Sequence, residues 1–154
     1  MTDSAVLTAP VSQVGTLEGA AFGPSSWREI GQDDVDVFAR LTGDDNPIHV
    51  DADAAARSPY GTRIAHGLLT LSFVVPMLRE VFSVTGASTG IVYGLNRVRF
   101  PAAVPAGARV RIRGQVAEVT EVSGGWQAVL SLTYEVEGNE KPACVAEFVL
   151  RYYS

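Results

Sequence analysis

The amino-acid sequence predicts an α+β fold in which an antiparallel sheet covers one dominant apolar helix. Two observations support this prediction. The residues from about 66 to 82 are almost all apolar, as expected for a helix that is buried on most of its sides. From about residue 89 onward, apolar and polar residues alternate in long runs that glycine-rich turns separate. A sheet that packs on the helix would bury the apolar residues of both segments.

The composition restricts the number of domains and the class of partner. A chain of 154 residues that is 47% hydrophobic can form one domain with a substantial core. We expect a single domain over residues 25–154. Residues 1–24 are rich in small residues, Gly and Pro, and predict an extended or mobile arm. The net charge of −5 lacks the basic excess of a nucleic-acid-binding protein, so no nucleic-acid partner is expected.

The sequence also indicates where the protein functions. Asp3 lies near the N-terminus, and no basic segment precedes an apolar one, so no secretory signal is expected. The apolar run from Ile64 to Leu78 is short for a membrane span and contains Pro76. The single cysteine, Cys144, lies in an apolar strand-like run, which favours a buried thiol. We therefore expect a cytoplasmic protein with no membrane partner.

The first half of the chain is expected to contain short elements. A short strand over residues 26–30 precedes a helix over residues 33–42, and Gly43 is suited to end that helix. Residues 51–57 are expected to form one or two helical turns. In the main helix that follows, Pro76 lacks a backbone donor and should kink or split the helix one residue earlier.

The second half of the chain is expected to form strands. Residues 89–100 are the first candidates, and arginines alternate with apolar residues over residues 109–113 until Gly114, where we expect a bulge. The alternation is clearest from residue 126 to 136, and residues 144–153 form the last predicted strand. An open antiparallel sheet leaves an edge strand, so edge-to-edge dimerisation is expected.

One short segment, Gly43 to His49, brings a carboxylate, an amide and an imidazole together on a turn. Gly, Asp, Asn and Pro are also residues that ordinary loops use, but a loop role leaves His49 unexplained. Pro47 restricts Asn46 to extended geometry, so the His49 ring can lie beside Asp44 while Asn46 bonds the loop backbone. A carboxylate and a neutral imidazole that hold one water form an acid–base pair.

A metal site is the alternative use of the acidic residues in this region. Its spacing matches no metal signature, and it lacks a second nearby histidine or a cysteine. The aspartates after His49 suit a helix N-cap and first turn. We therefore expect no metal. The candidates for this alternative are Asp44, Asp45, His49, Asp51 and Asp53.

The pair His66-Gly67 begins the main helix, where free backbone N–H groups can point at a developing oxyanion. A glycine there would let an acyl carbonyl approach the backbone. The alternative is that Gly67 only packs closely and that His66 caps the helix or packs. Arg97 and Arg99 share a strand face that is either solvated or used for a phosphate-bearing ligand. The sequence has no nucleophile-elbow, P-loop or dinucleotide-binding pattern.

The segment Phe38 to His49, together with the later run Ile64-Ala65-His66-Gly67, resembles the signature of the MaoC-like, (R)-specific enoyl-CoA hydratases. The run from Tyr93 to Pro101 is also similar to this family. The resemblance implies a hot-dog fold, in which an antiparallel sheet wraps around a long central helix. It further implies a homodimer with active sites near the subunit interface.

The resemblance also implies a hydro-lyase of fatty acid metabolism, which adds water reversibly and syn to a trans-2-enoyl thioester to give the (R)-3-hydroxyacyl thioester. In the matching positions, Asp44 and His49 would be the catalytic pair. Asn46 would be an orienting residue, and the Gly67 N–H would be the oxyanion donor. The reaction requires no metal and no redox cofactor. Further candidates for substrate binding are His66, Tyr60, Arg97 and Arg99.

Three alternatives stay open at this point. A 3-hydroxyacyl-ACP dehydratase would use the same residues on a carrier-protein thioester in place of an acyl-CoA. A hot-dog thioesterase also needs a carboxylate and an oxyanion-holding helix end, but it does not need a histidine five residues after the aspartate. A non-catalytic acyl-binding subunit needs neither, so the intact set of Asp44, Asn46 and His49 favours an active enzyme.

Overall fold

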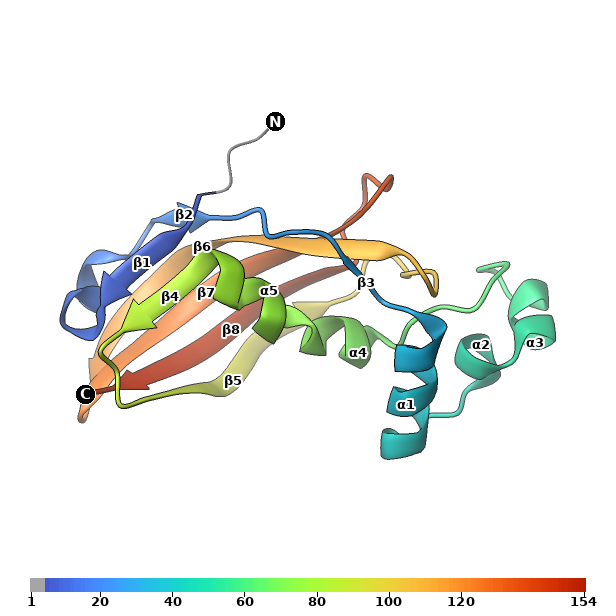
Figure 1. Ribbon diagram of the computed structural model, residues 1–154, viewed down its shortest axis with the longest axis horizontal. Coiled ribbons are helices and arrows are strands. Elements are labelled where there is room, and N and C mark those ends of the chain that lie inside the picture. Colours follow the sequence, from blue (N-terminus) through green and yellow to red (C-terminus); the bar gives the residue numbers. More distant parts are fainter. Residues whose placement is uncertain (1–4) are drawn as a thin grey trace.

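The computed structural model describes residues 5–154 and shows a curved antiparallel sheet wrapped around two consecutive helices (Figure 1). The strand order is β2-β6-β7-β8-β5, and β3 pairs with β6 beside β2. This is the hot-dog arrangement, so the predicted fold class is confirmed. The strands are β2 (Ala21–Phe22), β3 (Arg28–Glu29), β5 (Thr89–Arg99), β6 (Arg109–Val122), β7 (Gly125–Val136) and β8 (Cys144–Tyr153).

The central helix is divided into α4 (Gly67–Ser72) and α5 (Val74–Val81). Pro76 lies in the first turn of α5, where a missing N–H removes no intrahelical hydrogen bond. In one continuous helix, that N–H would have bonded the Ser72 carbonyl. The predicted split is confirmed, but it falls at Phe73, further from the proline than expected. Among the described residues, no helix is both long and apolar enough to cross a membrane.

Part of the N-terminal segment packs in the core, which corrects the predicted arm for residues 5–24. Residues 1–4 lie outside the described part of the chain. Val14 is fully buried, and Leu17 and Phe22 belong to the core cluster. Each short element here buries only one or two side chains, so no period is visible in the sequence. The elements are β1 (Leu7–Pro10), the 3-10 helix η1 (Val11–Thr16) and β4 (Phe82–Thr85), which pairs in parallel with β1.

Three helices lie beyond one end of the sheet (Figure 1). They are α1 (Gln32–Thr42), α2 (Pro47–Val50) and α3 (Ala52–Arg57). Gly43 ends α1 with a φ of 75°, as predicted from its position. The short helix α2 was not expected. It forms because the Asn46 side chain accepts a hydrogen bond from the Ile48 N–H, while Pro47 occupies a first helical position that needs no donor.

Apolar and charged side chains lie on opposite faces of the sheet, as the alternating pattern predicts. The inner face buries Ile112, Leu130 and Tyr134 against the helices. The outer face carries ion pairs between neighbouring strands. Burial alone would raise the pKa of Glu135, but hydrogen bonds from two arginines hold that pKa below its usual value. The ion pairs join Arg109 to Glu137, and both Arg111 and Arg113 to Glu135.

The expected bulge at Gly114 is wrong. Gly114 pairs regularly with Leu132, and the register shift in β6 falls between Val116 and Glu118. A Cβ atom on Gly114 would lie 2.6 Å from side-chain atoms of both Leu132 and Phe22. The glycine is therefore explained by close packing against the core, which alternation alone cannot distinguish from a bulge.

Cys144 is fully buried, as the sequence predicted, and its burial raises the pKa of the thiol to about 12. Since the thiolate is the reactive form, we expect the native protein to react very slowly with dithiodipyridine at about pH 8. The same protein in denaturant should release one equivalent of thiopyridone at once, because the chain has one cysteine. A rapid reaction of the folded protein would contradict the buried, neutral thiol.

Candidate active site

Two segments that are distant in the sequence meet beyond the end of the sheet. The first, here called the acidic turn, comprises residues 43–49 and leads from α1 into α2. The second, here called the α4 entry, comprises residues 64–67. They lie side by side because the Ile64 N–H donates to the Ile48 carbonyl at 3.1 Å. This contact brings the two histidines of the chain together.

The His49 ring is held by the backbone of the α4 entry. It is only 7% exposed, and its Nδ1 atom lies 2.7 Å from the Ile64 carbonyl oxygen. A carbonyl oxygen can only accept, so Nδ1 of His49 carries the hydrogen. The Nε2 atom of the neutral ring then keeps its lone pair. Nε2 is therefore the atom of His49 that can take up a proton.

The His66 ring stacks on the His49 ring, with centroids 3.8 Å apart and planes inclined by 29°. Its Nε2 atom donates to the backbone carbonyl oxygen of Asp44 at 2.9 Å. Its Nδ1 atom is buried and has no hydrogen-bond partner among the described residues. The ring of Phe38 in α1 lies on it as well, with centroids 4.9 Å apart. His66 thus joins the α4 entry to the acidic turn and to α1.

The Asp44 carboxylate lies close to both rings. One ligating atom each of Asp44, His49 and His66 falls within 4.8 Å of the others. Asp44 is exposed, and its carboxylate forms no hydrogen bond or ion pair with any residue that the structure describes. The structure therefore places the carboxylate and the imidazole together, as expected from the spacing of the acidic turn.

The same three residues could be considered as metal ligands. The lone pair of an imidazole nitrogen lies in the ring plane, and zinc–nitrogen bonds are about 2.0–2.1 Å long. Two rings that are stacked face to face cannot both direct such lone pairs at one ion, so this geometry does not suit a shared metal. Asp51 instead caps α3 by accepting from the N–H groups of Asp53 and Ala54, and the Ala54 bond holds the pKa of its carboxyl below the usual value.

A cavity of about 260 Å³ opens beside the histidine pair. Its wall includes His49, Tyr60, Gly67 and Phe100. A Cβ atom on Gly67 would lie 2.9 Å from Cδ2 of Phe100, so only glycine leaves room for this ring. Gly67 is the first residue of α4, where backbone N–H groups have no acceptor within the helix. Phe100 was not predicted as a site residue, since its one signal is its place in the run that resembles the family.

Arg97 and Arg99 do not reach this cavity. They line a separate cavity of about 300 Å³ on the outer face of the sheet, with Thr133 and Glu147. Val98 between them packs toward the core. The structure thus separates both arginines from the histidines, and their predicted part in binding a phosphate-bearing ligand stays a prediction. The Ile64 carbonyl was not predicted as part of the site, because a backbone oxygen leaves no trace in the residue types of a sequence.

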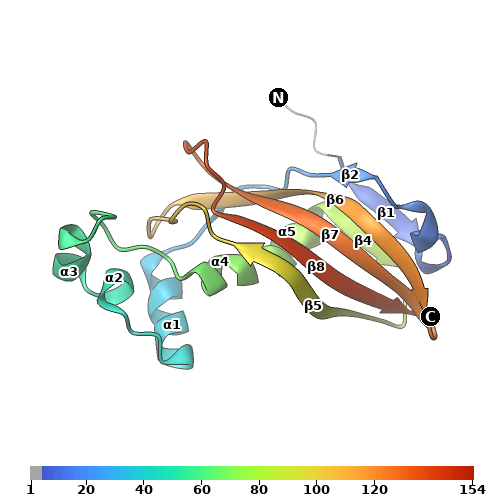
Figure 2. The same ribbon diagram turned by 180° about the vertical axis from the view of Figure 1, so that it is seen from behind.

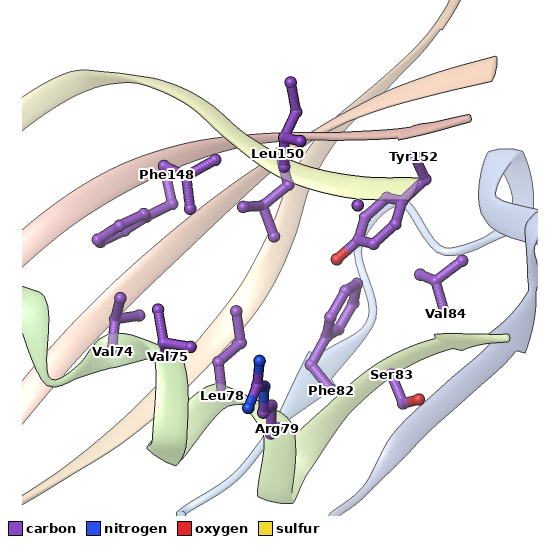
Figure 3. A pocket seen from close by; sticks show the side chains of 13 residues that line it. Val74, Val75, Leu78, Arg79, Phe82, Ser83, Val84, Phe148, Leu150 and Tyr152 are labelled. Carbon is purple, nitrogen blue, oxygen red and sulfur yellow. The ribbon is translucent and has the colours of Figure 1, made fainter. Parts of the chain in front are cut away.

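A further groove of about 270 Å³ lies between α5, β4 and the strands β5 and β8. Figure 3 shows Val74 and Leu78 facing Phe148 and Leu150 across it. Its wall is mostly apolar and contains no residue of the acidic turn or of the α4 entry. Ile91 and Val92 of β5 form part of the wall. Since β5 is the edge strand of the sheet (Figure 2), the groove extends to that edge.

Comparisons with known proteins relate this site to a family. A family model described as a MaoC like domain matches residues 13–137. The chain is 46% identical over 143 residues to 3-hydroxyacyl-thioester dehydratase Z of Mycobacterium tuberculosis (strain ATCC 25618 / H37Rv), with 92% of this chain and 95% of the relative covered.

Two solved structures share the fold. The monoamine oxidase regulatory protein from Archaeoglobus fulgius has a TM-score of 0.79 at 20% identity, with 97% of this chain and 99% of that chain covered. The (R)-hydratase from A. caviae involved in PHA biosynthesis has a TM-score of 0.70 at 25% identity, with 86% and 94% covered. Since the family model matches most of the residues and the mycobacterial relative is similar over nearly its whole length, the chain belongs to the MaoC-like family of hydratases and dehydratases.

Proposed function

We propose that this hydro-lyase is an (R)-specific enoyl-CoA hydratase, which adds water reversibly and syn to a trans-2-enoyl-CoA to give the (R)-3-hydroxyacyl-CoA. The observation that carries the proposal is that Asp44, with an exposed carboxylate, and His49 each have a ligating atom within 4.8 Å of the other, while Nδ1 of His49 is bonded to the Ile64 carbonyl and Nε2 is left for proton transfer. One water can bridge two groups at that separation, because each hydrogen bond spans about 2.8 Å. The names of the mycobacterial dehydratase and of the A. caviae hydratase agree with this chemistry.

In the proposed mechanism, the Asp44 carboxylate and His49 hold the attacking water between them. The Nε2 atom of His49 removes a proton from the water as its oxygen bonds to the β-carbon of the enoyl thioester. The electron pair of the double bond moves toward the thioester, and the Gly67 N–H donates to the oxygen on which the charge develops. A proton from the pair then returns to the α-carbon on the same face, which restores both side chains.

Asn46 and Tyr60 have supporting parts in this proposal. Asn46 keeps the acidic turn in shape, since its side chain accepts from the Ile48 N–H at 3.3 Å and its carbonyl accepts from the His49 N–H at 2.9 Å. Tyr60 is half exposed and lines the cavity beside His49, where it would contact the acyl thioester. A cytoplasmic location is also part of the proposal, because the one cysteine is an unpaired buried thiol.

The test is turnover of trans-2-enoyl-CoA thioesters of increasing chain length, with chiral analysis of the product. Formation of the (R)-3-hydroxyacyl-CoA supports the proposal. The reverse reaction, started from that product, should reach the same equilibrium mixture. Release of free coenzyme A would instead identify a thioesterase. Turnover of a carrier-protein thioester alone would identify a 3-hydroxyacyl-ACP dehydratase, and inactivity on both substrates would favour a binding subunit.

We further propose that the enzyme is a homodimer that pairs along β5. Among the described strands, β5 pairs only with β8, so its other edge is unpaired, and the strand carries exposed apolar residues, including Ile91 at 41% and Val92 at 53% exposure. An unpaired apolar edge of this kind favours the addition of another strand. A second copy along β5 would also cover the groove at α5.

We expect light scattering to give about twice the chain mass of 16.4 kDa for the wild type. Val92→Lys should shift the protein toward the monomer, because a charge at the pairing edge opposes association. The matched control is Val37→Lys, which alters a valine of 44% exposure on α1 and should leave the dimer unchanged. A wild type that is monomeric at all concentrations would refute the proposed dimer.

A further inference from the structure

His66 contacts both members of the catalytic pair, and the proposed mechanism gives it no step. Its Nε2 atom donates to the Asp44 carbonyl, and its ring lies face to face with the His49 ring. We propose that His66 is a positioning residue, which fixes the distance between Asp44 and His49 and transfers no proton itself. This inference rests on the proposed function, in which these two residues hold one water.

The hydrogen bond from His66 holds the Asp44 peptide in place. Residues 43–46 of the acidic turn are all exposed, so little packing holds this part of the turn. The Asp44 N–H makes a long, local hydrogen bond of 3.3 Å to the Thr42 hydroxyl. Within the described part of the chain, the bond from His66 is the one hydrogen bond that joins Asp44 to a residue distant in sequence. Its loss would let the peptide rotate and carry the carboxylate away from His49.

Ring contacts also hold His66 between two helices. His66 is 2% exposed and lies between Phe38 of α1 and His49 of α2. The backbone of His66 is also fixed, because its carbonyl accepts from the N–H of Thr70 in the first turn of α4. The His66 ring therefore forms a rigid wall that sets the plane of His49, whose own Nδ1–H is bonded to Ile64.

The nitrogen atoms of His66 are unsuited to proton transfer. Its Nε2 hydrogen is committed to a carbonyl oxygen, and its Nδ1 atom is buried without a partner among the described residues. Neither atom faces a group that can exchange a proton with it, so the ring contributes a hydrogen-bond donor and a flat face. In the proposed mechanism, the proton transfers are therefore left to the exposed carboxylate of Asp44 and to Nε2 of His49.

Two variants separate the effect of the His66 hydrogen-bond donor from the effect of its stacked ring. His66→Phe keeps the ring and removes the donor, while His66→Gln places an amide N–H near the position of Nε2 and removes the ring. We expect His66→Phe to lower kcat about 100-fold with KM within about threefold, since misplacing a reacting group by about 1 Å costs that much. His66→Gln should recover kcat to within about tenfold of the wild type. Equal losses in both variants would overturn the role of the donor.

A double-mutant cycle identifies the residue through which His66 acts. In the Asp44→Asn background, His66→Phe should lower kcat by less than about threefold further, because the carboxylate that it positions is already gone. A second loss of about 100-fold in that background would show an independent action and overturn the inference. The control for damage to the core is Tyr134→Phe, which removes a buried 3.0 Å bond to the Leu71 carbonyl of α4 and should lower Tm while kcat stays within about twofold.

Hydrogen exchange tests the inference without any substrate. The amides of residues 43–46 should exchange about tenfold faster in His66→Phe than in the wild type, and at nearly the wild-type rate in His66→Gln. If the wild type has no hydratase activity while the exchange rates follow this pattern, the proposed function fails and the positioning of the turn stands. Unchanged exchange in His66→Phe would refute the positioning, whatever the activity.

Discussion

Replacing His49 with asparagine is expected to lower kcat for hydration by about 10² to 10⁴, which is the range that a positioned acid or base contributes. The asparagine amide can take the place of Nδ1–H and keep the bond to the Ile64 carbonyl, which is 2.7 Å long in the wild type. The substitution therefore removes Nε2 and leaves the anchoring bond. Thermal unfolding should show a folded protein, and steady-state kinetics should show the loss in kcat with a smaller change in KM.

The partner substitution, Asp44→Asn, should cause a loss of the same order, because the amide has the shape of the carboxylate and lacks its charge and basicity. The matched control is Asp45→Asn, which removes the same charge one residue away. Asp45 lies with Asp36 and Arg40 on another side of the turn. Its variant should keep kcat within about twofold. If the two variants lost the same activity, the effect would come from the charge of the turn and not from a catalytic carboxylate.

The second large effect is expected at Gly67. A Cβ atom there would lie 2.9 Å from the Phe100 ring, so Gly67→Ala must push the ring into the cavity or shift the start of α4. Both movements disturb the place where the thioester oxygen would meet the Gly67 N–H. We expect kcat/KM to fall about 10- to 100-fold, in keeping with the effect of weakening an oxyanion donor or misplacing the substrate.

Two further variants test this explanation. Adding Phe100→Ala to Gly67→Ala should recover part of the lost kcat/KM, because the truncated side chain no longer meets the new methyl group. The control is Gly31→Ala, where a Cβ atom would have its nearest contact at 3.7 Å and should leave kcat/KM within about twofold. A double variant as slow as Gly67→Ala alone would show that the clash with Phe100 is not the cause.

Much of the fold followed from local patterns. The helix that ends at Gly43, the divided central helix and the bounds of β8 each arise from one strong signal, namely a glycine with positive φ, a proline in an apolar helix and an alternating run. Residues 5–24 gave no such signal. Their strands are short, and one of them pairs with β4 in parallel, so burial there depends on tertiary contacts.

The placement of Arg97 and Arg99 shows why a site can be partly hidden from sequence. Leu95 pairs with Phe148 and Val98 pairs with Ala146, so three residues of β5 span the distance of two residues of β8. This extra residue moves Val98 to the inner face and turns both arginines outward. Strict alternation from Leu95 would have placed them inward. The meeting of Asp44 with His49, in contrast, depends on a turn of a few residues that the sequence describes directly.

The bond from His49 to the Ile64 carbonyl bears on how this site tolerates change through evolution. A main-chain oxygen is present whatever side chain residue 64 carries, so substitution among apolar residues there leaves the tautomer of His49 unchanged. The same residue donates its N–H to Ile48, which makes proline the one replacement that the position excludes on backbone grounds. The tautomer of His49 is thus determined by the course of the backbone. Substitutions of cavity side chains can therefore change the cavity without changing that tautomer.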